Sequence, residues 1–157
     1  MEEYENVALA FGGNIGDTEV VFNKAIDLLK KSGLKNIKSS FLYSNPAIDC
    51  IPDTPDFINT ALTGQWNKSS EELLKICQNI EMFLGRPEAH TSDTSRVIDI
   101  DIILFGSHVI NKQYLRIPHA RACKRLFVLL PLEKIASNWV FPDKKKSVSE
   151  LLNLLQS

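Results

Sequence analysis

The chain has 157 residues and a formal net charge of −1, with 44% hydrophobic and 24% charged residues. This length predicts a single domain, residues 1–157, with a substantial apolar core. The near-neutral charge excludes a general attraction to nucleic acid or anionic membranes, and no apolar run is long enough to span a bilayer. The acidic N-terminus does not resemble a signal peptide, and three cysteines without Cys-x-x-Cys spacing indicate reduced thiols, so we expect a cytoplasmic protein.

The first apolar run, residues 7–11, is typical of a buried strand. A glycine-containing turn at 12–17 follows, and then a helix that begins at Asp17 or Thr18 and ends before Gly33. The turn contains neither the Gly-x-Gly-x-x-Gly fingerprint nor a P-loop, so any use of ATP must proceed without these motifs. Two interpretations of the turn remain open: a sharp corner between strand and helix, or a functional loop.

Residues 37–43 and 57–66 are expected to form the next two strands. The connection between them contains three prolines and three acids and is too long for a tight hairpin, and long loops often carry function. Phe57 and Asn59 share one face of the second of these strands. An aromatic ring beside an amide suits the binding of a flat polar heterocycle, although ordinary sheet packing explains the same pattern.

A capping box at 69–72 opens the next helix, and Gly85 ends it. The apolar stripe of this helix extends to Phe83, which we expect to face the core. Gln78 and Glu81 lie on one side of the helix, a spacing that is typical of a solvated face.

A polar loop without periodicity follows, and Arg86 and Arg96 lie at its two ends. Such a loop could close over a phosphate chain, because arginine presents a fixed fork of donors to phosphate oxygens. It could equally be plain surface whose arginines pair with neighbouring acids.

The most informative stretch is the apolar run 97–105, which contains Asp99 and Asp101. Residues two apart on a strand point to the same face, so the two carboxylates share one face. The opposite face is then formed by Ile98, Ile100 and Ile102. Two like charges side by side are costly unless a cation neutralises them, and oxygen ligands together with phosphates suit Mg²⁺. An exposed strand with solvated acids is the alternative.

The C-terminal part predicts a short hairpin between 109 and 119 and a helix over 121–130 whose start is basic. His119 precedes this basic segment and is either a structural histidine or part of an anion site. A second capping box at 147–150 opens a last helix. The order β-α-β-β-α-β, followed by a hairpin and C-terminal helices, predicts an α+β ferredoxin-like sandwich with an antiparallel sheet.

The pattern Arg96-x-x-Asp99-x-Asp101 followed by 102–106 is similar to the signature Arg-Thr-Leu/Ile-Asp-Leu-Asp-Ile-Leu of the 6-hydroxymethyl-7,8-dihydropterin pyrophosphokinase family. The resemblance extends over roughly residues 7–143. Further matching motifs are Gly13-Asn14, Asn45-Pro46, Pro55-Asp56-Phe57-Ile58-Asn59, Ile80-Glu81, Gly85-Arg86, and Pro118-His119 with Arg125 and Phe127.

The resemblance implies transfer of pyrophosphate from ATP to the hydroxymethyl group of a pterin, with release of AMP, in folate biosynthesis. It implies two Mg²⁺ ions on Asp99 and Asp101. The implied catalytic residues are Arg86, Arg96, Asp99 and Asp101. The residues implied around ATP are Gln78, Glu81, Arg86, Arg96, Ile102, His119 and Arg125. The residues implied around the pterin are Asn45, Pro46, Ile48, Phe57, Asn59 and Phe127.

The loop 87–95 departs from the family pattern, since Glu88, Ser92 and Asp93 stand where two arginines and a tryptophan are usual. Ala120 stands where a tyrosine is common. We therefore expect a weaker grip on MgATP and a less complete closed state. A pterin- or nucleotide-binding relative with weak or lost activity is the alternative.

An RNA-binding module, which the same order of elements also suits, would need exposed strand aromatics and a basic surface. No such aromatic run is present, and the sequence pI is near 6.3. We expect small-molecule substrates, without nucleic acid or membrane partners, and a monomer or weak dimer.

Overall fold

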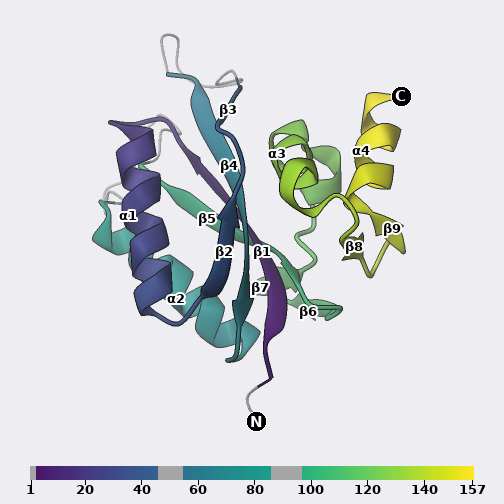
Figure 1. The fold of residues 1–157 in the computed structure, drawn as a ribbon, viewed down its shortest axis with the longest axis horizontal. Helices are drawn as coiled ribbons and strands as arrows, with labels where there is room; N and C mark the ends of the chain where they lie inside the picture. Colours follow the sequence, from purple (N-terminus) through teal and green to yellow (C-terminus); the bar gives the residue numbers. More distant parts are fainter. Residues whose placement is uncertain (1–2, 46–54, 86–96) are drawn as a thin grey trace.

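The computed structural model describes residues 3–45, 55–85 and 97–157 (Figure 1). In chain order the elements are β1 (Glu5–Gly13), α1 (Thr18–Lys31), β2 (Lys35–Ser39), β3 (Tyr43–Asn45), β4 (Phe57–Trp66), α2 (Ser70–Phe83), β5 (Asp99–Phe105), β6 (Ile110–Lys112), β7 (Leu115–Ile117), the 3-10 turn η1 (Ala122–Lys124), α3 (Leu126–Ala136), β8 (Val140–Phe141), β9 (Lys146–Ser147) and α4 (Val148–Gln156).

The main sheet has the strand order β2-β4-β1-β5, and every neighbouring pair in it is antiparallel. Each of the two βαβ units is split by a strand inserted between its own two strands. This arrangement confirms the predicted ferredoxin-like α+β fold. The hairpin β6–β7 and the C-terminal helices are also present as predicted.

The strand predicted over 37–43 is divided into β2 and β3, which both pair with β4. The division occurs at Ser40, whose hydroxyl oxygen accepts a hydrogen bond from the Ala61 N–H at 2.9 Å. A side-chain oxygen there replaces a backbone carbonyl of the ladder, so the regular strand is interrupted. The helix predicted over 121–130 is likewise divided, into η1 and α3, with Arg125 as the residue between them.

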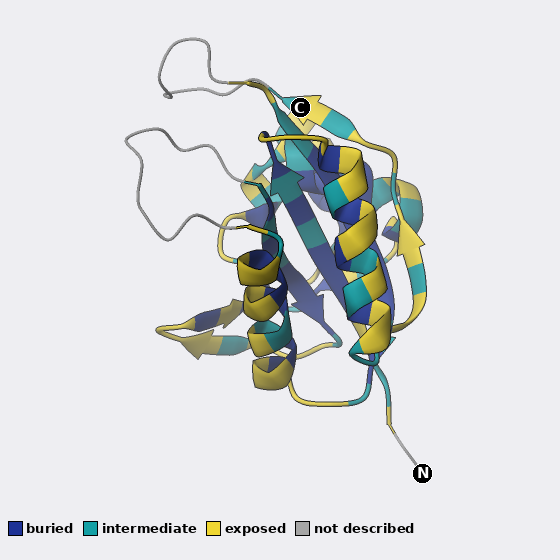
Figure 2. Cartoon of the chain, turned by 90° about the vertical axis from the view of Figure 1, so that its left-hand side faces the viewer, coloured by how far each residue is buried: buried dark blue, intermediate teal, exposed yellow. Residues whose placement is uncertain are grey.

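Helices cover both faces of the sheet (Figure 1). On one face, α1 and α2 lie side by side with their inner sides buried and their outer sides exposed (Figure 2). Under them lie Leu9, Phe11 and Trp66, which are at most 1% exposed. The Phe11 ring meets the Phe22 ring of α1 edge-on at a centroid distance of 5.4 Å. On the other face α3 and α4 cover a second apolar cluster.

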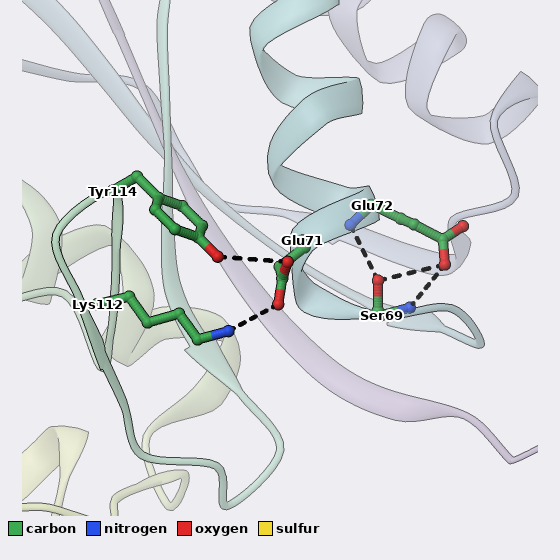
Figure 3. A network of polar contacts seen from close by, with 5 residues as sticks. All are labelled: Ser69, Glu71, Glu72, Lys112 and Tyr114. Carbon is green, nitrogen blue, oxygen red and sulfur yellow. Dashed lines mark hydrogen bonds and ion pairs between the residues drawn. The ribbon is translucent and has the colours of Figure 1, made fainter.

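The start of α2 is held by polar contacts on two sides (Figure 3). The predicted capping box is present, since the Ser69 hydroxyl accepts from the Glu72 N–H at 3.1 Å. Glu71 accepts a hydrogen bond from Lys112 of the hairpin at 2.8 Å, and the Lys112 ammonium lowers the pKa of Glu71. At the other end of α2, Phe83 is 76% exposed, so the prediction that it faces the core is wrong. Asn79 and Met82 are exposed as well, whereas Ile80 and Leu84 pack toward the core, so Phe83 lies on the outer side of the helix.

In the described part of the chain, no helix is both long enough and apolar enough to cross a membrane.

Candidate functional site

A cavity of about 390 Å³ opens on the sheet face that carries α3. Side chains from β1, β3, β4, β5 and the start of α3 line it. Its predicted site residues are Asn45, Phe57, Asn59, Asp99, Asp101, Arg125 and Phe127. Predicted site residues that are up to 82 positions apart in the chain, from Asn45 to Phe127, therefore meet around one cavity.

The cavity exists because the residues of the central strand β1 that face this side have small side chains or none. Ala10 pairs with Asp101 and Gly12 pairs with Asp99, so the smallest side chains of β1 lie beside the two acids. Gly12 also pairs with Asn59 of β4. A Cβ atom on Gly12 would lie 3.1 Å from the Asn59 side-chain oxygen, which is closer than an ordinary contact. Sequence reasoning missed Ala10 and Gly12, although the alternation of large and small residues along 7–12 was a readable signal.

The aspartate pair lies as predicted. Ile98, Ile100 and Ile102 are at most 5% exposed on the α1/α2 side, whereas Asp99 and Asp101 line the cavity on the other side. Within 3–45, 55–85 and 97–157, no group of three or more His, Cys, Asp or Glu side chains could hold a metal ion. Two carboxylates alone fit Mg²⁺, which is usually held by one or two carboxylates together with water and substrate phosphates.

Two aromatic rings and an amide occupy the opposite part of the same cavity. Phe57 is the first residue of β4 and Phe127 lies in the first turn of α3, and the Arg125 guanidinium lies 5.4 Å from the centre of the Phe127 ring. Asn59 is only 5% exposed, and its Nδ2 donates to the Tyr43 carbonyl at 3.2 Å and to the Asn45 side-chain oxygen. These bonds fix the amide so that its orientation does not change with solvent.

The glycine-containing turn after β1 supports this wall of the cavity. Asn14 is 5% exposed, and its Nδ2 donates to the Pro55 carbonyl at 3.0 Å. The bond connects the turn to the backbone just ahead of Phe57. Asn14 is a further residue whose role sequence reasoning did not find, because Pro55 is distant in the sequence.

A second cavity of about 300 Å³ is strongly basic. Arg116, His119, Arg121 and Arg125 line it, and Arg125 also lines the first cavity. An anion site around His119 and the basic segment after it was one of the two interpretations that the sequence left open. Arg116 was missed, because nothing local shows that β7 brings its side chain to the same hollow.

His119 lies between the two cavities. Its Nδ1 accepts from the Arg121 N–H at 3.2 Å, so the neutral ring carries its proton on Nε2. That Nε2 lies 4.0 Å from a carboxylate oxygen of Asp101. Burial lowers the pKa of His119; Asp101 opposes this shift, and the positive charges of Arg125 and Arg121 add to it. The imidazole is therefore neutral at pH 7 and can donate a hydrogen bond without adding charge.

The remaining predicted residues lie elsewhere. Gln78 is exposed on α2, and the Ile102 side chain is buried in the core beneath α1 and α2. The Glu81 side chain is buried against β5 and lines neither cavity. Four predicted residues lie outside the described part of the chain, as does the altered loop 87–95: Pro46, Ile48, Arg86 and Arg96.

Comparison with known proteins decides the family. The family model for 7,8-dihydro-6-hydroxymethylpterin-pyrophosphokinase (HPPK) matches residues 8–137. The chain belongs to the HPPK family. It is 32% identical over 152 residues to the 2-amino-4-hydroxy-6-hydroxymethyldihydropteridine pyrophosphokinase of Synechocystis sp., covering 96% of this chain and 76% of that protein.

Other HPPK relatives are longer proteins. The chain is 36% identical over 129 residues to a folate synthesis bifunctional protein of Arabidopsis thaliana, covering 82% of this chain and 26% of that protein. A crystal structure of Plasmodium falciparum HPPK-DHPS with pteroate superimposes with a TM-score of 0.75 at 14% identity. It covers 98% of this chain and 43% of that chain, and this likeness bears on the fold alone. The chain thus spans about a quarter of the length of several of its curated relatives.

Proposed function

We propose that the chain transfers pyrophosphate from ATP to the hydroxymethyl group of 6-hydroxymethyl-7,8-dihydropterin and releases AMP, as a step of folate biosynthesis. One observation carries the proposal: a single cavity holds an aspartate pair, two aromatic rings and a fixed amide, and it adjoins a basic cavity through Arg125. Membership in the HPPK family supports the same reaction.

The aromatic part of the cavity suits the pterin. Phe57 and Phe127 offer ring faces on which a flat heterocycle stacks, and the Asn59 side-chain oxygen can accept a hydrogen bond from the edge of that heterocycle. Asn45 holds the Asn59 amide in place. Backbone groups at Pro46 and Ile48 complete the pterin site in this proposal.

The acidic part of the cavity suits the reacting groups. Asp99 and Asp101 would hold Mg²⁺, two ions in this proposal. Bound Mg²⁺ neutralises the triphosphate, aligns it with the pterin hydroxyl and makes that hydroxyl a better nucleophile. The aspartates would orient the ions, and the two ring faces would hold the hydroxymethyl group in line with the β-phosphorus.

The basic cavity suits the phosphate chain. Arg116, Arg121 and Arg125 present cationic, fork-shaped groups of donors that match phosphate oxygens. Arg86 and Arg96 would supply further charge as catalytic residues, and His119 would donate from Nε2. In this proposal Gln78 and the backbone of Ile102 contact the nucleotide from the α2 side of β5.

The proposal treats residues 1–157 as one domain that acts as a monomer or weak dimer in the cytoplasm, in the diphosphotransferase class. The altered loop 87–95 remains the reason to expect weak MgATP binding. Normal ATP affinity, together with protection of this loop from proteolysis when nucleotide and pterin are added, would contradict that expectation.

The reaction is tested by incubating the chain with Mg²⁺, ATP and the pterin alcohol and following the products by phosphorus NMR. We expect AMP and a pterin diphosphate in equal amounts. Formation of ADP would show transfer of a single phosphoryl group, and absence of any product would leave the alternative, a binding protein without turnover.

A further inference from the structure

Glu81 of α2 is a buried acid that accepts a hydrogen bond from the backbone of the strand that carries the aspartate pair. The residue is 6% exposed, and its Oε2 accepts a hydrogen bond from the Ile100 N–H at 2.8 Å. Gln78, almost one turn earlier on the same helix, is exposed. The pattern that predicted one solvated side for both residues is therefore wrong for Glu81.

Ile100 is the residue between Asp99 and Asp101. It lies on β5, which is the last strand of the sheet and pairs with β1 on its inner side. An edge strand presents unpaired N–H groups on its outer side, and a buried N–H without an acceptor costs about 1–3 kcal/mol. Ile100 is 5% exposed, so its N–H needs such an acceptor. The Glu81 carboxylate meets this need with a charge-assisted bond.

The carboxylate approaches β5 from the side opposite to the metal position. α2 packs with the isoleucines on the sheet face that α1 and α2 cover, which we call the closed face. Asp99 and Asp101 line the cavity on the other face, which carries α3 and which we call the open face. Glu81 thus reaches the backbone that separates the two acids but lines neither cavity. The Cys77 thiol of α2 also lies near these charges: burial, and then the charges of Glu81 and Asp101, raise the pKa of Cys77 to about 12.

We propose that Glu81 is a positioning residue for the metal-binding aspartates: by holding the Ile100 N–H it fixes the backbone between them, so that both carboxylates keep the geometry that Mg²⁺ needs. Groups that hold metal ligands in place typically account for 10–100-fold in metal affinity. The inference rests on the proposed function for the metal, but the Glu81–Ile100 contact can be measured without turnover.

The test compares Glu81→Ala with Glu81→Gln, in which an amide oxygen can still accept the bond. Asn79→Ala, an exposed change on the same helix, is the matched control. Amide hydrogen exchange at Ile100 is measured by NMR in each protein. We expect Ile100 exchange to rise about 10–100-fold in Glu81→Ala. We expect it to stay near the wild-type rate in the other two variants.

Metal binding supplies the second readout. Mn²⁺ affinity is measured with a non-hydrolysable ATP analogue, and the Mg²⁺ dependence of AMP release is measured in parallel. Glu81→Ala is expected to weaken metal binding about 10–100-fold while the pterin KM changes less than about twofold. Glu81→Gln should restore most of the metal affinity. If Glu81→Ala does not fold, Glu81→Asp, whose shorter side chain withdraws the carboxylate from Ile100, replaces it.

Two results would overturn the inference. Unchanged Ile100 exchange and unchanged Mn²⁺ affinity in Glu81→Ala would show that the bond positions nothing. A raised nucleotide KM in both Glu81 variants, with Ile100 still protected, would instead make Glu81 a direct nucleotide contact, as the family resemblance implies. A wild-type protein without turnover would refute the proposed function, but the exchange and Mn²⁺ measurements would still decide the role of Glu81.

Discussion

The two faces of β1 are built from opposite kinds of side chain. Val7, Leu9 and Phe11 point to the closed face and are at most 1% exposed under α1 and α2. The alternate residues Ala8, Ala10 and Gly12 lie on the face toward α3, where the second and third of them line the cavity. The large side chains of β1 thus fill the core on one face of the sheet, and its small residues leave room for the cavity on the other face.

β5 shows the same division in chemical form. Ile100 and Ile102 of β5, and Ile98 just before it, are buried on the closed face, and the two acids of β5 lie on the open face. Burial of a large apolar side chain contributes about 1.5–3 kcal/mol of stability, whereas adjacent like charges oppose folding until a cation neutralises them. We infer that the closed face stabilises the fold and that the open face gives up stability for binding. Substitutions on the two faces test this division.

The largest effect is expected from the acids on the open face. Asp99→Ala or Asp101→Ala should lower turnover by at least about a thousandfold, because in the proposed function each removes a ligand of the Mg²⁺ that neutralises the triphosphate. Metal-dependent nucleotide binding, measured by calorimetry, should weaken in both. The thermal midpoint should stay the same or rise, since each change removes one of two repelling charges. A variant that unfolds instead would show that these acids support the fold.

A substitution on the closed face should instead lower the stability of the protein. Phe11→Ala removes a buried ring that packs edge-on against Phe22 and should lower the free energy of unfolding by about 3–5 kcal/mol. Ala10→Gly, the neighbouring change on the open face, should cost only about 0.5–1 kcal/mol. Urea unfolding of both variants measures the difference. Similar losses in both would contradict the division between the faces.

Alanine substitutions of two glycines, one on each face of the sheet, should affect two different properties of the protein. Gly12→Ala brings a methyl group to 3.1 Å from the Asn59 amide and should raise the pterin KM about tenfold, equivalent to about 1.4 kcal/mol. Gly64→Ala, on β4, brings one to 2.9 Å from the Leu34 side chain in the closed core and should instead cost about 1–3 kcal/mol of stability. Gly12→Ala should therefore have the larger effect on the pterin KM, measured by steady-state kinetics. Gly64→Ala should have the larger effect on stability, measured by urea unfolding.

The smallest effect concerns pH. Because burial lowers the pKa of His119, the unfolded chain binds more protons than the folded protein once pH falls below the ordinary histidine value of 6.5. The stability that the neutral ring contributes is complete above that value and is lost as pH falls through the lower pKa of the folded state. His119→Asn should remove this loss. Urea unfolding at about pH 7.5 and about pH 5.5 measures it, and identical pH dependence in both proteins would refute the assignment.

Much of this architecture could be predicted because it depends on local signals. The alternation around Asp99 and Asp101, the two capping boxes and the order of strands and helices are each encoded within a few residues. These signals place the acids on one face and set the antiparallel order. The pairing of Phe57 with Asn59 on one face was likewise readable from period two.

The missed features depend on tertiary position. Glu81 is buried because the edge of β5 passes beside it. Ser40 divides a strand by bonding to Ala61, which lies 21 residues away. Arg116 joins the basic cavity through the placement of the hairpin. In each case the two parts of the chain that come together are too far apart to be seen in one short stretch of sequence.

The most direct test of the account is a crystal of the chain soaked with Mn²⁺, a non-hydrolysable ATP analogue and the pterin alcohol. Anomalous scattering locates the metal independently of the protein atoms. The account predicts metal peaks in contact with Asp99 and Asp101, between the triphosphate and the pterin hydroxyl. Peaks elsewhere, with these two carboxylates turned away from every phosphate, would contradict it.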